Sequence, residues 1–397
     1  MSRLEWIALV GITTVLALVR VLPAHPPRRV AIRVDCQHAD ACALAESLAS
    51  DVWSEDRGPG LPLDVVVSDD RLARLVAAGV TYEILVPDID AAARAEHARI
   101  SVAHAGDWFA EYHDYRAITE HLHELAALAP DRARVEPIGS SLDSRTIWAL
   151  HIGRRGGTPM LVDGTQHARE WIAAAVSTCV ADRLVRDYDR DPQIRDFVDH
   201  TDLWVVPVVN PDGYQYSWSA DRYWRKNRRG GHGVDLNRNF SVAWGGDGSS
   251  RFKSSQVYRG ERPFSEPETA ALRDLALREH VKLHVDFHAY GQLLLYPWGY
   301  TATPTKDAAR FAAIGDRVAS ALFAPHETRY RLMSAVELYP ASGTASDWMY
   351  GEAGALSYTI ELRPRGGSGF VLPPEQIRPT CDEGLAAVLA LRGAENP

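Results

Sequence analysis

The chain has 397 residues, of which 46% are hydrophobic, and it carries a formal net charge of −9. This length can hold two domains, or one large domain with an appendage, and the composition suffices for a sizeable buried core. The acidic balance and the lack of a long Lys or Arg run argue against nucleic acid as a partner, because such a partner requires clustered positive charge.

An uncharged apolar run from Trp6 to Val19 stands near the start of the chain. It is short for a membrane span but has the length of a signal-peptide core. We therefore expect residues 1–27 to be a signal peptide and the protein to be secreted. Glu5 before the run and Arg20 after it depart from the usual pattern, so a membrane anchor that is not cleaved is the alternative.

A first pattern of short elements follows, over residues 28–95. It predicts a small α/β domain from an alternating strand at Val30–Val34, a helix at Ala41–Trp53, a strand at Leu63–Val67, a helix capped by Ser68 that ends at Gly79, and a strand at Tyr82–Val86. A charged, Ala-rich helical stretch, Asp88–Arg99, leads into a predicted linker over residues 96–107.

Residues 108–397 show a longer alternation of helices and strands. It predicts helices near Tyr115–Ala129, after Trp171, after Thr305 and at the C-terminus, and strands near Ile147, Met160, Trp204, Val281–Phe287 and Ser357–Glu361. We expect a mixed, mostly parallel central sheet with helices on both faces. Residues 210–264 are rich in Gly, Ser, Arg and Trp with little periodicity, which predicts a long functional loop.

The four cysteines give an even count, as in proteins of an oxidising compartment. Cys36 and Cys42 are the only pair that the spacing suggests. Cys179 lies in an apolar helical run, where we expect it to act as a small buried hydrophobic residue.

Three predicted strand ends carry side chains that could bind a metal ion. His167 and Glu170 follow an apolar strand and open a helical run, so on one helical turn they would face the same way. His288 ends a second strand and Glu361 a third, and sites in open α/β sheets gather beyond the carboxyl ends of the strands. Catalytic zinc takes three such ligands and leaves one position open.

Each of these residues also has an ordinary structural explanation. His167 and Glu170 could be a solvated surface pair, His288 could be a hydrogen-bonded interior histidine, and Glu361 could pair with Arg363 or Arg365. The guanidinium and amide groups of Arg222–Arg228 and Asp235–Asn239 could grip a carboxylate, or could belong to a basic, solvated loop.

Taken together, these segments resemble the M14 (carboxypeptidase A/B-like) family of zinc metallocarboxypeptidases. The resemblance runs from about Trp108 to the C-terminus. It rests on motifs in the family's order: His167-Ala-Arg-Glu170, Trp224-Arg-Lys226, Asp235-Leu-Asn-Arg-Asn239, Phe287-His-Ala-Tyr-Gly-Gln-Leu-Leu-Leu-Tyr-Pro-Trp-Gly-Tyr300, Tyr339-Pro-Ala-Ser-Gly343, Ser346-Asp-Trp348 and Thr359-Ile-Glu-Leu-Arg363.

The resemblance implies one Zn²⁺ per chain, held by His167, Glu170 and His288, with Asp235 as the carboxylate that orients His167. It implies that Glu361 is the general base, which takes a proton from the attacking water and returns one to the leaving amine.

The same resemblance assigns the substrate contacts. Arg225 matches the group that stabilises the oxyanion, and Arg169 the one that binds substrate further out. Asn237, Arg238 and Tyr339 match the clamp on the substrate's terminal carboxylate. Such a clamp makes the enzyme an exopeptidase, since an internal peptide bond brings no carboxylate to the arginine.

The expected specificity follows from departures within the side-chain pocket. Ser346 stands where family members that prefer Lys or Arg carry an acid, and Thr344 stands where Gly is common and narrows the pocket. Without an acid, a buried cationic side chain lacks a partner. We therefore expect release of neutral, apolar or aromatic residues, unless another acid such as Glu337 reaches the pocket. Ala289 replaces a common Ser, and we expect little effect.

The segment before residue 108 is similar to the inhibitory propeptide of the family, which has a small open-sandwich (ferredoxin-like) fold. The resemblance implies a propeptide at 28–95, an activation linker at 96–107 with Arg94 and Arg99 close by, and a catalytic domain at 108–397. We expect a monomeric proenzyme whose partners are an activating protease and peptide or protein C-termini. The alternatives are a non-catalytic member of the fold and a zinc amidase or deacylase.

Overall fold

The computed structural model describes residues 27–36, 38–54, 61–100, 106–366 and 369–393. The predicted signal peptide lies outside these ranges apart from its last residue, and so does the centre of the predicted linker. Within the described ranges, no helix combines the length and the apolar character that crossing a membrane requires.

A small unit comes first in the chain. Its four strands are antiparallel and take the order β2-β3-β1-β4, which is the ferredoxin-like arrangement that was expected. Its elements are β1 (Arg29–Val34), α1 (Ala39–Leu48), β2 (Asp51–Val52), β3 (Leu63–Ser68), α2 (Asp69–Ala77) and β4 (Tyr82–Val86). Val30, Ile32 and Val34 face a core shared with the two helices, whereas Ala31 and Val66 pack into the core of the large unit.

One prediction for this unit is wrong. The helix expected over Ala41–Trp53 ends at Leu48, and Asp51 and Val52 instead pair with Val66 and Val65 of β3. Trp53 is fully buried, and its ring stacks on Tyr223 of the large unit with the centroids 5.1 Å apart. Tertiary contacts therefore override the local helical pattern.

The large unit is built on an eight-stranded sheet of order β11-β10-β12-β9-β7-β8-β6-β5. The central strands β12, β9, β7 and β8 run parallel, and β10 and β6 are antiparallel to their inner neighbours. The strands are β5 (Ala133–Ser140), β6 (Thr146–Gly153), β7 (Thr158–Gly164), β8 (Thr201–Val206), β9 (Leu283–Ala289), β10 (Leu293–Tyr296), β11 (Arg331–Ser334) and β12 (Leu356–Leu362).

Helices cover both faces of this sheet, as expected for strands that are apolar on both sides. One face packs against α4 (Tyr115–Leu128), α5 (Trp171–Arg186), α6 (Pro192–His200), α9 (Ala308–Phe323) and α12 (Ile377–Gly393). The other packs against α8 (Pro267–Arg278) and α11 (Ala345–Gly351). A short α10 (Ala335–Leu338) follows β11, and the predicted long loop contains α7 (Pro211–Ser219) and two 3-10 turns, Arg229–Gly231 and Leu236–Arg238.

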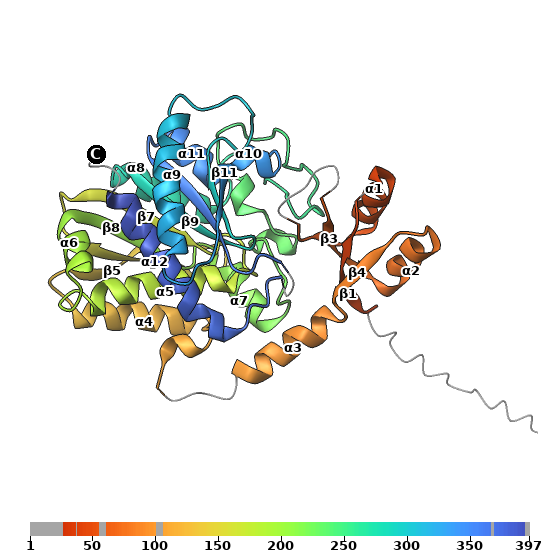
Figure 1. The fold of residues 1–397 in the computed structure, drawn as a ribbon. Coiled ribbons are helices and arrows are strands. Elements are labelled where there is room, and N and C mark those ends of the chain that lie inside the picture. Colours follow the sequence, from red (N-terminus) through yellow and green to blue (C-terminus); the bar gives the residue numbers. More distant parts are fainter. Residues whose placement is uncertain (1–26, 37, 55–60, 101–105, 367–368, 394–397) are drawn as a thin grey trace, which may run out of the picture.

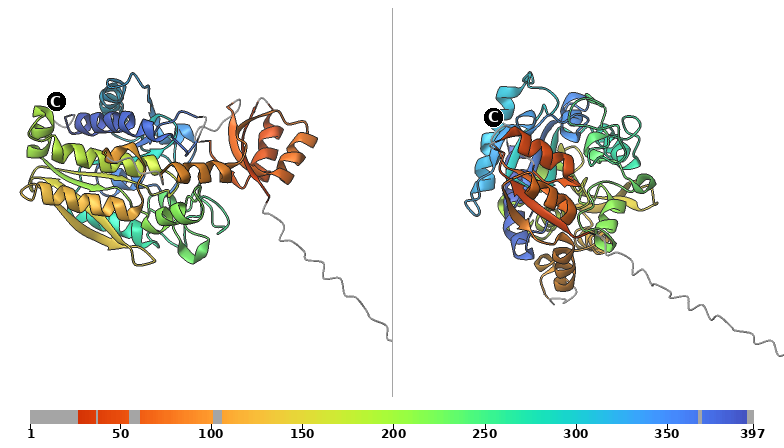
Figure 2. Two further views of the ribbon diagram at one scale, coloured as in Figure 1. Left: turned by 90° about the horizontal axis from the view of Figure 1, so that it is seen from below. Right: turned by 90° about the vertical axis from the view of Figure 1, so that its right-hand side faces the viewer.

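The two units lie end to end, with α3 (Ile89–Ile100) running between them (Figures 1 and 2). The first residues of the predicted linker are therefore helical. Two disulfides are present. Cys36 bonds Cys42, as the spacing suggested. Cys179 is buried as expected but also bonds Cys381, which ties α5 to α12 across a sequence separation of 202.

Candidate active site

The candidate site lies where β12, β9 and β7 end side by side. His288 and Glu361 are paired residues on β9 and β12, and Gly164 at the end of β7 pairs with Phe287. Because these strands are parallel, their carboxyl ends meet at one edge of the sheet. The structure therefore brings the three predicted strand ends together.

His167 and Glu170 lie at the strand-to-helix turn that the sequence predicted, although they do not share a helical turn. They lie in the turn between β7 and α5, and α5 begins only at Trp171. The turn nevertheless brings the two side chains together, with His167 Nδ1 2.8 Å from Glu170 Oε1. His288 Nδ1 lies 3.1 Å from both His167 Nδ1 and Glu170 Oε2.

These three side chains fit a zinc ion. All are buried, and their ligand atoms lie within 4.8 Å of one another. Each histidine turns Nδ1 toward the common centre, while its Nε2 faces a carboxylate: Asp235 Oδ1 at 3.1 Å from His167 and Asp286 Oδ2 at 2.9 Å from His288. A proton held on Nε2 leaves the Nδ1 lone pair directed at the metal position.

Asp286 is a residue that the sequence reasoning missed. It is fully buried and also accepts a hydrogen bond of 2.8 Å from Gln166 Nε2. The signal was present, because residues two apart on a strand face the same side and Asp286 precedes His288 by two. The family resemblance supplied such a carboxylate for His167, namely Asp235, but none for His288.

Asp235 joins the candidate metal site to an arginine. Its Oδ2 accepts hydrogen bonds from Arg225 Nη2 and Nε at 3.0 and 3.2 Å, while its Oδ1 faces His167. Burial alone would raise the pKa of Asp235, but the charge of Arg225 and the contact with His167 hold it well below the usual range. Asp235 is therefore a carboxylate, and it fixes the positions of both neighbours.

Arg238 and Tyr339 lie side by side near the same site. Arg238 is buried, and its guanidinium donates to the carbonyls of Gly248 and Asn237 at 2.8 and 2.6 Å and lies 3.5 Å from the Tyr339 hydroxyl. Gly343, with φ of 75°, permits this arrangement, since a Cβ there would lie 2.5 Å from the Arg238 carbonyl oxygen. The Asn237 side chain accepts from Ala345 N at 2.8 Å.

The remaining predicted residues also lie around this site. Arg169 is buried, stacks over Phe370 at 4.0 Å and forms an ion pair with Asp51 of the small unit. Ser346 is buried in the first turn of α11. Glu361 is buried on β12, and Arg363, one of its alternative partners, binds Glu383 at 3.1 Å instead.

Comparison with known proteins identifies the family. The sequence profile of the zinc carboxypeptidase family, peptidase M14, matches residues 118–387. The chain belongs to this family. Carboxypeptidase B of Astacus astacus is 39% identical over 297 residues, which cover 71% of this chain and 96% of that protein. Carboxypeptidase A1 of Rattus norvegicus is 33% identical over 366 residues, covering 87% of each chain.

Solved structures of similar proteins have the same fold as this zinc carboxypeptidase over both units. The crystal structure of thrombin activatable fibrinolysis inhibitor has a TM-score of 0.85 at 28% identity and covers 93% of this chain and 100% of its own. Carboxypeptidase A from Helicoverpa armigera has a TM-score of 0.83 at 29% identity, covering 93% and 98%. The expected fold is confirmed, and the chain is a zinc carboxypeptidase of the A/B type, a hydrolase that acts on peptide C-termini.

Proposed function

We propose that this zinc carboxypeptidase is made as a latent proenzyme and removes single neutral, apolar or aromatic residues from peptide C-termini. The observation that supports the proposal is the buried Arg238 beside Tyr339. The preceding residue, Asn237, has its Nδ2 3.4 Å from Nε2 of His288, a member of the cluster of His167, Glu170 and His288. A cation that can bind a terminal carboxylate thus lies near the metal ligands, as an exopeptidase requires.

The proposed chemistry uses a small set of groups. Zinc at His167, Glu170 and His288 would polarise the scissile carbonyl and the attacking water. Glu361, the next residue across the sheet from His288, takes a proton from that water and delivers one to the leaving amine. Arg225, held in place by Asp235, offers its positive charge to the oxyanion as negative charge develops there.

The proposed specificity depends on the surroundings of Ser346. Glu337, the acid that could have reversed the expectation, is exposed and accepts from the backbone N and Oγ of Ser334 at 3.1 and 2.8 Å. Asp347 is buried, burial raises its pKa to about 7, and its oxygens accept from the Gly299 N–H. Neither carboxylate is thus arranged to receive a cationic side chain, which favours neutral residues.

The proposed latency depends on contacts between the two units. Residues 46 and 49–52 of the small unit line one cavity with Arg169, Arg225, Arg238 and Tyr339. Asp51 forms an ion pair with Arg169, and a buried ion pair of 2.5 Å joins Glu96 of α3 to Arg222. The small unit thus forms one wall of the cavity that contains Arg238 and takes up space that a substrate C-terminus would need. Arg94 and Arg99 are exposed on α3 and offer an activating protease its cleavage points.

The biological setting proposed here is secretion of a monomer that carries one zinc ion. The predicted signal peptide and the two disulfides support export, since disulfides persist in oxidising compartments. Retention by a membrane anchor is the alternative.

One assay tests the function. The zinc-loaded chain, before and after limited trypsin treatment, is given blocked dipeptides that end in Phe, Leu, Arg or Glu, together with their C-terminal amides and a chelator control. We expect activity only after trypsin, on the free acids, with Phe and Leu preferred. Equal rates on acids and amides would refute the exopeptidase assignment, and full activity before trypsin would refute latency.

A further inference from the structure

A single row of paired residues crosses four strands at the edge of the active site. His288 of β9 pairs with Glu361 of β12, Glu361 with Leu293 of β10, and Leu293 with Arg331 of β11. Directly paired residues point to the same face of a sheet, and adjacent strands are about 4.8 Å apart. The Cα of Arg331 therefore lies about 10 Å from that of Glu361, on the same face of the sheet.

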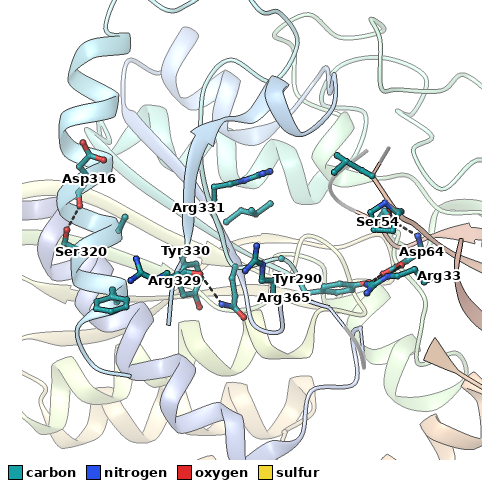
Figure 3. A pocket seen from close by; sticks show the side chains of 17 residues that line it. Arg33, Ser54, Asp64, Tyr290, Asp316, Ser320, Arg329, Tyr330, Arg331 and Arg365 are labelled. Carbon is teal, nitrogen blue, oxygen red and sulfur yellow. Dashed lines mark hydrogen bonds and ion pairs between the residues drawn. The ribbon is translucent and has the colours of Figure 1, made fainter. Parts of the chain in front are cut away.

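A groove of about 810 Å³ opens at this row, between the two units (Figure 3). The large unit lines it with Tyr290, Leu293 and three arginines, Arg329, Arg331 and Arg365. All three arginines are exposed. Asp316 of α9 is the acid that the large unit contributes, so positive charge dominates on the enzyme's side.

The small unit runs from Arg169, the residue before the proposed ligand Glu170, into this groove. Asp51 pairs with Arg169, and Ser54, three residues later, lines the groove. Three residues of extended chain span about 10 Å, and Arg331 lies a similar distance from Glu361 across the sheet. A substrate whose scissile bond lies at Glu361 can follow the same path once the small unit has been removed. Its side chains three and four residues upstream would then reach the arginines.

We propose that Arg329, Arg331 and Arg365 form an upstream subsite that favours peptides with Asp or Glu three to four residues before the scissile bond. This rests on the proposed exopeptidase function and adds a second recognition element to it. Guanidinium groups pair well with carboxylates, but exposed pairs are weak and are screened by salt. The preference is therefore expected to be several-fold and to fall as ionic strength rises.

The test uses two peptides that end in Leu and differ only in having Glu or Gln at the third and fourth positions before the scissile bond. With the trypsin-treated, zinc-loaded chain at low salt, kcat/KM should be about three- to ten-fold higher for the Glu peptide. In 0.5 M NaCl the ratio should approach one. Arg331→Gln, and more strongly the triple Gln variant that includes Arg329 and Arg365, should lower the low-salt ratio toward one.

Arg190→Gln is the matched control. Arg190 is exposed and follows α5, whose other end adjoins Glu170. The 16 residues of that helix place it about 24 Å from the metal site. This variant should keep the wild-type ratio. A wild-type ratio of one or below, or a ratio that the triple variant leaves unchanged, overturns the proposal. Failure to release Leu from either peptide would instead count against the exopeptidase function.

Discussion

Asp286 should strengthen zinc binding without touching the metal, and Asp286→Asn isolates that effect. The carboxylate is fully buried and lies 2.9 Å from His288 Nε2. It also accepts a hydrogen bond of 2.8 Å from Gln166 Nε2. Asn keeps the shape and one acceptor oxygen but removes the negative charge. The imidazole then keeps an acceptor for its Nε2 proton but loses the charge that makes Nδ1 a better donor.

Loss of a carboxylate behind a metal-bound histidine typically weakens metal affinity about 10- to 100-fold, or about 1.4 to 2.7 kcal/mol. The upper part of this range is expected because the contact is wholly desolvated. The assay is competition for zinc against a chelator of known affinity. Urea unfolding of the metal-free protein checks that the variant is folded.

Asp202→Asn provides the matched control. Asp202 faces His151 Nε2 at 2.5 Å, so the same kind of pair is broken. It lies at the start of β8, whereas the proposed metal ligands lie at the carboxyl ends of the parallel strands. Zinc affinity should be unchanged in this variant. If Asp286→Asn remains folded and binds zinc within two-fold of the wild type, the argument that Asp286 supports His288 is refuted.

Four further changes test other parts of the molecule. Glu361→Gln should lower kcat by about 10²- to 10⁴-fold with zinc content unchanged, and loss of zinc would show that this side chain is a ligand instead. Ser346→Asp should raise the ratio of kcat/KM for peptides ending in Arg to that for peptides ending in Leu by about 30-fold or more, because the buried cation gains a partner. An unchanged ratio would place the side-chain pocket elsewhere. Asp51→Asn should allow the uncleaved chain to hydrolyse dipeptides measurably, because Arg169 loses its ion pair. No activity in the uncleaved variant would show that other contacts suffice for latency. Burial raises the pKa of Glu268 to about 7 from 4.5, so the protonated side chain stabilises the fold at low pH and this stability is lost as pH rises toward 7. Between pH 5 and 8, the free energy of unfolding of Glu268→Gln should therefore fall by about 2 to 3 kcal/mol less than that of the wild type, as measured by urea unfolding. Parallel pH profiles of the two proteins would contradict the shift.

Much of the site could be predicted from the sequence because its residues lie at the ends of strands. His288 and Glu361 close apolar runs that predict adjacent parallel strands, and the rule that sites gather at their carboxyl ends then places both at one edge. The same reasoning placed His167 and Glu170 at a strand-to-helix turn, but it took the two residues to share one helical turn. A helical pattern continues through the turn before Trp171, and the turn is set by contacts that the local pattern does not contain, such as the hydrogen bond from Ala168 N to the Arg225 carbonyl.

Features that depend on residues distant in the sequence could not be predicted from local patterns. Cys179 reads as an apolar helical residue because its partner, Cys381, is 202 positions away on another helix. The local pattern predicts a helix at residues 51–53 because their partners come later in the chain. Asp51 and Val52 pair with β3, and Trp53 stacks on the ring of Tyr223.

Substrate recognition beyond the scissile bond depends on sheet register, and register is the hardest property to infer from one sequence. Leu293 lies opposite both Glu361 and Arg331, and a shift of one residue in either pairing would turn Arg331 to the opposite face, away from the groove. No local pattern around Arg331 predicts this pairing, because β11 is a four-residue edge strand. His288 and Glu361 are less exposed to such an error, since burial on both faces fixes β9 and β12 relative to β7. Specificity at the edge of the sheet can therefore change more readily than the chemistry at its centre.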